Sequence, residues 1–192
     1  SLDIDFCLCW ANENWTRRWD GLENDVLISQ KHSPEDDIAF LDDIMPALKD
    51  ERYIKVDGKP LLILYRASSL PDAKETGKRW REHAIKNGLP GLYLVVVNAF
   101  DVSSPQPYDF DAIVEFPPHQ IGAKDITDSI TPLNKNFTGR VYDYEELALR
   151  AGKIDNDNFT CFKAVMPSWD NEARKPTQGF SFYNAKPELY AK

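Results

Sequence analysis

The chain has 192 residues, 42% hydrophobic and 28% charged, a composition typical of one soluble globular domain. Its formal net charge of −8 argues against a general nucleic-acid binder and against docking on anionic lipid, because both need a positive surface. No apolar run approaches the roughly 18 residues that span a bilayer, so no membrane insertion is expected.

The three cysteines, Cys7, Cys9 and Cys161, are too few for a disulfide framework. Cys7 and Cys9 lie two residues apart in an expected strand and share a face, which prevents an easy bridge between them. All three are expected to be small buried residues in a reducing compartment. This pattern predicts a cytoplasmic protein.

Short apolar runs alternate with helical patterns along the chain, which predicts an α/β protein with parallel strands. No glycine-rich GxGxxG or GxxxxGK turn is present, which disfavours an open nucleotide-binding sheet. Polar residues at many strand ends favour a (β/α)8 TIM-barrel-like fold. Five strands cannot close that barrel, so residues 1–192 are expected to be a single domain, the central part of a barrel lacking its first and last strands. The five runs are Ile4–Trp10, Leu61–Tyr65, Leu92–Val97, Ala112–Phe116 and Cys161–Met166.

Four helices are expected between and after these runs. The first begins at the N-cap Ser33, and Pro46 should kink or shorten it. The second spans Pro71 to Asn87 and stops at Gly88. A capping box of Asp143 and Glu146 opens the third, which Gly152 ends, and the segment from Lys186 to Lys192 begins a fourth.

The segment from Trp10 to Trp19, directly after the first predicted strand, is the densest group of polar and aromatic residues. It contains three of the five tryptophans, two amides, one carboxylate and two guanidinium groups. Indole rings stack on the apolar C–H face of a sugar, while amides and carboxylates bind its hydroxyl groups. The alternative is a core strand followed by a loop that an Arg–Glu ion pair holds. We favour a sugar site, and its expected members here are Trp10, Asn12, Glu13, Asn14, Trp15, Arg17 and Trp19.

The other predicted strands also end in polar residues. A carboxylate that closes an apolar strand, such as Glu115, is costly unless it is paired or functional, and a structural pair with Arg66 is the alternative. Two prolines then form a rigid turn that presents His119. Since parallel strands end at one rim, these side chains are expected to converge on the sugar site. The remaining expected binding residues are Arg66, Asn98, His119, Trp169 and Asp170.

Four blocks in this order resemble the WbsX-type lipopolysaccharide-biosynthesis proteins, a family similar to glycoside hydrolase family 99. The resemblance covers nearly the whole chain and implies a (β/α)8 barrel, a bacterial origin and a role in building or trimming surface polysaccharide. It also implies an Asn-Glu-Trp block with a further glutamate in the last part of the barrel, so the central catalytic acids are expected outside this chain. The four blocks are CWANENWTRRWDG, YIKVDGKPLLILYR, FDAIVEFPPH and VMPSWDNEARK.

The leading hypothesis is a glycosidase-like or glycosyl-transferring enzyme that acts on an oligosaccharide or polysaccharide. Glycosidic cleavage needs one acid and one base or nucleophile, and Glu13 and Glu115 are the best-placed carboxylates, three strands apart. No cofactor and no metal are expected, because Glu115 and His119 have no recognisable metal-ligand spacing. Three alternatives stay open: a transferase using an activated sugar donor, a non-catalytic glycan-binding or scaffold domain, and a fragment inactive without the acidic block. The sequence does not predict an oligomeric state.

Overall fold

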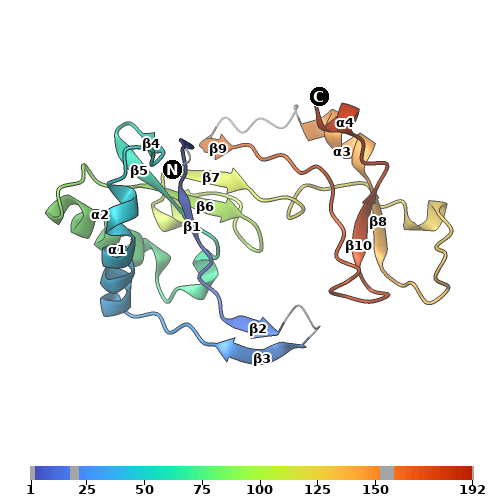
Figure 1. Ribbon diagram of the computed structural model, residues 1–192, viewed down its shortest axis with the longest axis horizontal. Coiled ribbons are helices and arrows are strands. Elements are labelled where there is room, and N and C mark those ends of the chain that lie inside the picture. The colour runs from blue at the N-terminus through green and yellow to red at the C-terminus, as the bar shows by residue number, and fades with distance from the viewer. Residues whose placement is uncertain (1–2, 18–21, 152–157, 192) are drawn as a thin grey trace. The chain divides into compact units, whose positions relative to one another are not determined.

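The computed structural model describes residues 3–17, 22–151 and 158–191 (Figure 1). Two compact units divide the chain. Unit 1 comprises residues 1–14, 29–116 and 157–163, and unit 2 comprises residues 15–28, 117–156 and 164–192. The expectation that the chain is one domain stays a prediction.

Unit 1 contains a mostly parallel sheet in the order β1-β5-β6-β7-β9. Its strands are β1 (Leu8–Trp10), β5 (Lys59–Leu64), β6 (Tyr93–Asn98), β7 (Ala112–Glu115) and β9 (Thr160–Phe162), while β4 (Lys55–Val56) pairs antiparallel with β5. The five predicted apolar runs therefore form five neighbouring parallel strands, as expected for a mixed α/β protein. The last run is wrong in length, because β9 ends at Phe162 and residues from Ala164 onward belong to unit 2.

Two helices, α1 (Pro34–Leu48) and α2 (Ala73–Lys86), pack on one face of this sheet (Figure 1). The Ser33 hydroxyl accepts the Asp36 N–H at 3.1 Å and caps α1, as predicted. Pro46 lies in the last turn of α1, and the helix ends two residues after it, at Leu48. Helix α2 stops before Gly88, whose φ of +86° ends it as expected.

The apolar residues of the sheet separate by face because side chains alternate along a strand. Leu62 and Leu94 lie in the cluster with the helix residues Leu41 and Trp80. Leu61 and Val95 of the same strands lie in a second cluster, with Ala112. Each described helix of eight or more residues in unit 1 packs on the first of these two faces.

Unit 2 has a smaller core. Its strands β8 (Arg140–Asp143) and β10 (Phe180–Tyr183) pair in parallel, and α3 (Tyr144–Ala151) and α4 (Pro187–Tyr190) pack with them. The Asp143 carboxylate accepts the N–H groups of Glu145 and Glu146, which confirms the predicted N-cap of α3, whereas its predicted stop, Gly152, lies outside the described residues. The sequence did not predict the strands β8 and β10, nor an antiparallel hairpin of β2 (Trp15–Arg17) and β3 (Leu22–Ile28).

Within the described ranges, no helix is both long and apolar enough to cross a membrane.

Candidate functional site at the strand ends of unit 1

The first element of the site is a reciprocal contact between Asn12 and the backbone of Arg66. The Asn12 amide donates to the Arg66 carbonyl, and its oxygen accepts the Arg66 N–H, both at 2.8 Å. Asn12 is fully buried. Both polar groups of its side chain are thus used to join the end of β1 to the end of β5. This geometry makes Asn12 a positioning residue, since a ligand has no open access to it.

The two hydrogen bonds between Asn12 and Arg66, which we call the clamp, fix the backbone of Arg66 and so determine where its side chain lies. Its guanidinium is 3.0 Å from a carboxylate oxygen of Glu13, and it lies over the ring of Phe100, 4.3 Å from the centroid. Tyr65 contacts the rings of Phe100 and Phe116 edge-on, with centroids 5.5 and 5.3 Å apart. The ends of four strands, β1, β5, β6 and β7, therefore share one cluster of charge and aromatic surface. The carboxylate and the guanidinium are each partly exposed, so both are accessible from solvent.

Asn98 and Glu115 continue the cluster across the sheet. They are partners in the parallel register of β6 and β7, which puts them side by side at the strand ends. Lys163, just past β9, pairs with Glu115 at 3.1 Å. The side-chain oxygen of Asn98 is buried and has no hydrogen-bond partner among the described residues. A buried acceptor without a donor is costly, so a ligand hydroxyl at this point would lower the free energy of the site.

The order of the strands confirms the expected spacing of the two carboxylates. Glu13 follows β1 and Glu115 closes β7, three strands away. The alternative suggested for Glu115 was an ion pair with Arg66, and the structure shows other pairs. Arg66 pairs with Glu13, and Glu115 pairs with Lys163.

Trp10 has a place in the core. Its ring stacks on Phe40 with centroids 4.3 Å apart and contacts Trp80 and His32 edge-on. It packs with the helices α1 and α2 on the helix-bearing face of the sheet. The side chain supports the sheet and is left out of the strand-end cluster.

The remaining expected site residues lie elsewhere. Asn14 accepts the Gln30 N–H at 2.8 Å within unit 1. Trp15 and Arg17 belong to the hairpin of unit 2, where Trp15 is exposed and Arg17 pairs with Asp25 at 3.6 Å. Trp19 lies outside the described residues. The other three expected residues also belong to unit 2: His119, Trp169 and Asp170.

His119 lies in the predicted turn after the two prolines, and burial lowers the pKa of its imidazole below the ordinary value. No group of three or more histidine, cysteine or acidic side chains suited to a metal ion occurs in the described part of the chain.

Asp109 and Asp111, which have an Asp-x-Asp spacing, lie just before β7. The Asp111 carboxylate accepts the Leu94 N–H at 2.7 Å and pairs with Arg81 at 2.9 Å, while Arg81 also donates to the Asp109 carbonyl. These aspartates precede the strand, so they lie at the opposite edge of the sheet from Glu115. Their contacts join α2 to the sheet, which is a structural role.

Sequence reasoning missed four members of the cluster: Tyr65, Phe100, Phe116 and Lys163. The three aromatic residues end or follow apolar strands and look like core residues in the sequence. Their position after a buried strand is the only signal that predicts them. Lys163 was hidden because the last strand was predicted to continue to Met166.

The model of the family described as Glycosyltransferase WbsX matches residues 1–192. The chain belongs to this family. Its membership confirms the resemblance that the four sequence blocks predicted, and it supports a carbohydrate-related role.

Two curated relatives, from two strains of Xanthomonas campestris pv. campestris, bear the name "Uncharacterized protein WxcX". Each is 39% identical to this WbsX-family chain over 190 residues, which is 99% of the chain. The chain spans 27% of the length of these relatives. A solved structure described as a glycoside hydrolase-like protein aligns with 80% of this chain and 44% of its own, at a TM-score of 0.45 and 18% identity.

Proposed function

We propose that this chain is the carbohydrate-active part of a larger enzyme that acts on glycosidic bonds during the biosynthesis or processing of bacterial surface polysaccharide. The observation that carries the proposal is the strand-end cluster of unit 1. Neighbouring parallel strands there end in Glu13, Arg66, Asn98 and Glu115. Sites at the carboxyl ends of consecutive parallel strands are the usual arrangement in barrel enzymes. The membership of the WbsX glycosyltransferase family agrees with this substrate class.

Two features of unit 1 support the proposal that its sheet is an arc of a (β/α)8 barrel. The parallel strands follow one another in chain order, without the reversal of a doubly wound sheet. Both long helices pack on one face, and the other face carries the apolar cluster of Leu61, Val95 and Ala112. A barrel has its helices outside and apolar side chains inside, whereas an open parallel sheet has helices on both faces. The remaining strands belong, on this proposal, to other parts of the longer protein.

The cluster offers the groups that a neutral sugar needs. Tyr65, Phe100 and Phe116 give aromatic surface for the C–H face of a ring. Arg66 and the two carboxylates give charged partners for hydroxyl groups, whose hydrogen bonds are stronger than neutral ones. The unsatisfied oxygen of Asn98 provides an acceptor between them.

The two carboxylates are proposed to carry the chemistry or to orient the sugar for acids elsewhere in the longer protein. Backbones three strands apart are separated by about 14 Å, from spacings of about 4.8 Å. In this structure Glu13 contacts Arg66 next to β1, and Glu115 contacts Lys163 next to β9, so each carboxylate is held by a cation beside its own strand. A non-catalytic glycan-binding domain is the second candidate, favoured by the cation that each carboxylate already contacts.

The test uses the full-length protein with bacterial surface oligosaccharides as probes. Glu13→Gln and Glu115→Gln are each expected to lower turnover by about 100-fold or more if they act as acid or base. Glu82→Gln, an exposed residue of α2, is the matched control and should leave turnover unchanged. Turnover is followed by release of new reducing ends and by transfer to an acceptor sugar.

The outcomes separate the candidates. Weakened binding with undiminished turnover in both glutamine variants assigns the carboxylates to sugar orientation. Glycan binding without any turnover by the wild-type protein favours the binding domain. Failure of the wild-type protein to bind any glycan contradicts the proposal. Glycan binding that neither substitution changes contradicts it as well.

A further inference from the structure

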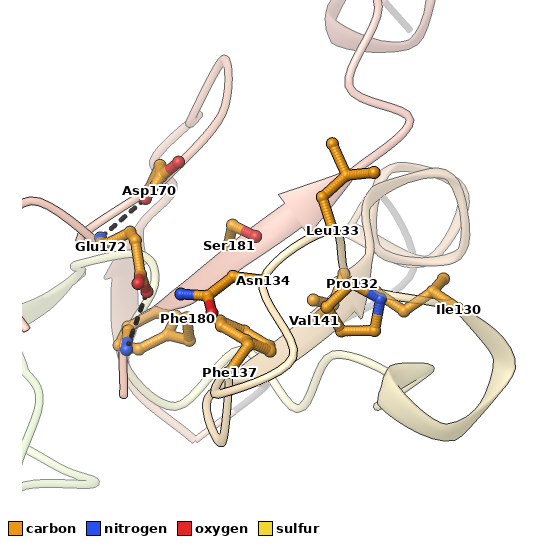
Figure 2. A pocket seen from close by; sticks show the side chains of 11 residues that line it. Ile130, Pro132, Leu133, Asn134, Phe137, Val141, Asp170, Glu172, Phe180 and Ser181 are labelled. Carbon is orange, nitrogen blue, oxygen red and sulfur yellow. Dashed lines mark hydrogen bonds between the residues drawn. The ribbon is translucent and has the colours of Figure 1, made fainter. Parts of the chain in front are cut away.

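Unit 2 contains a pocket of about 510 Å3 that the strand-end cluster does not use (Figure 2). Its walls come from one face of the β8–β10 pair, from the loop around Pro132 and Phe137, and from the segment around Asp170. That segment is held against β10, because the Phe182 N–H donates to the Trp169 carbonyl at 3.0 Å. The volume lies in the range of small-molecule sites.

The two ends of the pocket differ in chemistry (Figure 2). Aliphatic side chains gather at one end: Ile130, Pro132, Leu133 and Val141. Asp170 and Glu172 lie at the other end, with Ser181 between them and the aliphatic group. The rings of Phe137 and Phe180 complete the wall. A ligand that fills this pocket therefore needs an apolar end and a polar end.

The acidic end keeps hydrogen-bonding capacity for a ligand. Glu172 is used by the fold, since its carboxylate accepts the N–H groups of Thr177 and Gly179. Asp170 uses one oxygen to accept the Glu172 N–H at 2.7 Å. Within the described ranges, the second oxygen of Asp170 and the hydroxyl of Ser181 have no protein partner. These two residues are opposite each other in an antiparallel bridge, so both side chains face the same side.

We propose that this pocket binds an uncharged sugar with an apolar substituent, of the 6-deoxyhexose class. The proposal rests on the carbohydrate-related role of the chain but not on the strand-end cluster, which lies in the other unit. Asp170 and Ser181 bind vicinal hydroxyl groups, and Phe137 offers its ring to the C–H face. Two carboxylates at one end disfavour acidic or phosphorylated sugars by like-charge repulsion.

The aliphatic end selects the substituent. A methyl group at C6 packs on Leu133 and Ile130 without loss of hydrogen bonds. A hydroxymethyl group at the same place finds no hydrogen-bond partner on these two side chains and gives up the apolar contact of the methyl group, while its hydroxyl stays in water beside the exposed Leu133. A hydrophobic pocket rejects an added hydroxyl only moderately, so the preference is expected to be about 10-fold.

The first test measures the affinity of the full-length protein for two matched sugar pairs by ligand-observed NMR titration. The pairs are the methyl glycosides of L-fucose and L-galactose, and of L-rhamnose and L-mannose, whose members differ only in the hydroxyl at C6. We expect the deoxy sugar of at least one pair to bind about 10-fold more tightly than its counterpart. Equal affinities within both pairs, or no binding of any of the four up to about 50 mM, overturn the proposal.

The second test places the binding in the pocket. Leu133→Ser changes a fully exposed side chain and should reduce the deoxy preference without unfolding the protein. Asp170→Asn keeps the acceptor for the Glu172 N–H and should weaken binding of the deoxy sugar about 10-fold. Leu149→Ser, at an exposed position of α3 outside the pocket, is the control and should bind as the wild type does.

Arg66→Met distinguishes this proposal from the one for unit 1. It alters the strand-end cluster and should leave deoxy-sugar binding unchanged, even if it abolishes binding of a longer glycan. Deoxy-sugar binding that Arg66→Met removes and the Leu133 and Asp170 substitutions leave intact belongs to the strand ends, and it overturns the pocket proposal.

Discussion

Two tryptophans show how differently the two units treat a buried polar group. The indole N–H of Trp80, in the core of unit 1, donates to the Asp37 carbonyl at 2.9 Å, and the side chain is fully buried. The indole N–H of Trp169, in unit 2, is buried without a hydrogen-bond partner in the part of the chain that the structure describes. The ring of Trp169 stacks near Phe180, 6.2 Å between centroids, behind a wall of the proposed pocket.

The comparison separates scaffold from candidate binding surface. Around Trp80, the Asp37 carboxylate accepts from Thr76 at 2.9 Å and from Arg79 at 2.6 Å, so a buried charge is fully bonded. Buried side-chain atoms without a hydrogen-bond partner among the described residues occur in both units, at His32 and Asn98 in unit 1 and at Glu146, Arg150 and Trp169 in unit 2. Two of these residues, Asn98 and Trp169, lie in or beside a candidate binding surface, where a ligand or another chain segment can supply the partner.

The largest expected difference in stability comes from replacing each tryptophan with phenylalanine, which exchanges the indole ring for a smaller phenyl ring. Trp80→Phe removes a satisfied hydrogen bond and leaves a cavity in a close-packed core, and it should lower the free energy of unfolding by about 3 kcal/mol. Trp169→Phe removes a donor that has no partner among the described residues and leaves a smaller void at a partly buried site, so it should lower the free energy of unfolding by only about 1 kcal/mol. Urea denaturation followed by circular dichroism measures both. Equal losses in the two variants would break the comparison.

The clamp at the end of β1 provides the next test. Asn12→Ala leaves the Arg66 N–H and carbonyl without their partners in a buried place and should cost about 2 kcal/mol. The same change should weaken glycan binding, because Arg66 is then no longer held beside Glu13. Asn14→Ala, two residues away, removes one exposed hydrogen bond to Gln30 and is the control, with a loss of less than about 1 kcal/mol. If Asn12→Ala binds glycan normally despite reduced stability, the clamp serves folding alone.

The sheet of unit 1 was predictable because its strands carry continuous apolar runs. Runs such as Leu92–Val97 are buried on both faces, and a strand of that kind differs clearly from its surroundings. Helix limits followed from local chemistry, as at Ser33 and Gly88. The end of β9 was not predictable, because pairing sets it: Phe162 pairs with Val114, beside the end of β7.

The candidate site was predicted in outline and less well in detail. Charged and amide residues after apolar strands identified Glu13, Arg66, Asn98 and Glu115, since such residues stand out from the runs before them. The sequence gives no indication of where a side chain points, so the buried role of Asn12 and the core position of Trp10 emerged only from the structure. The strands β8 and β10 of unit 2 were not predicted, because they are four residues long and far apart in sequence.

The smallest expected effect on stability comes from substituting two tyrosines, one in each unit, and it extends the comparison of the two units to high pH. The Tyr53 hydroxyl, in unit 1, donates to the Leu61 carbonyl at 2.8 Å and accepts the Leu8 N–H at 3.1 Å. Burial raises the pKa of Tyr53 to about 12, from an unfolded value near 10. Burial also raises the pKa of Tyr144, in unit 2, whose hydroxyl donates to the Met166 carbonyl at 2.6 Å.

Because the unfolded chain loses the phenol proton first, the stability that Tyr53 contributes is fully present below pH 10 and is lost as the pH rises from 10 toward 12. Tyr53→Phe should therefore lower stability by about 1 kcal/mol at pH 7 and flatten the decline above pH 10. Tyr144→Phe should flatten the decline of stability above pH 10 less than Tyr53→Phe does, if the polar groups of unit 2 are less completely hydrogen-bonded than those of unit 1. Urea unfolding at a series of pH values measures both slopes. A steeper change for Tyr144→Phe would reverse the order of the two units, because the group with the larger pKa shift contributes the larger share of the pH dependence.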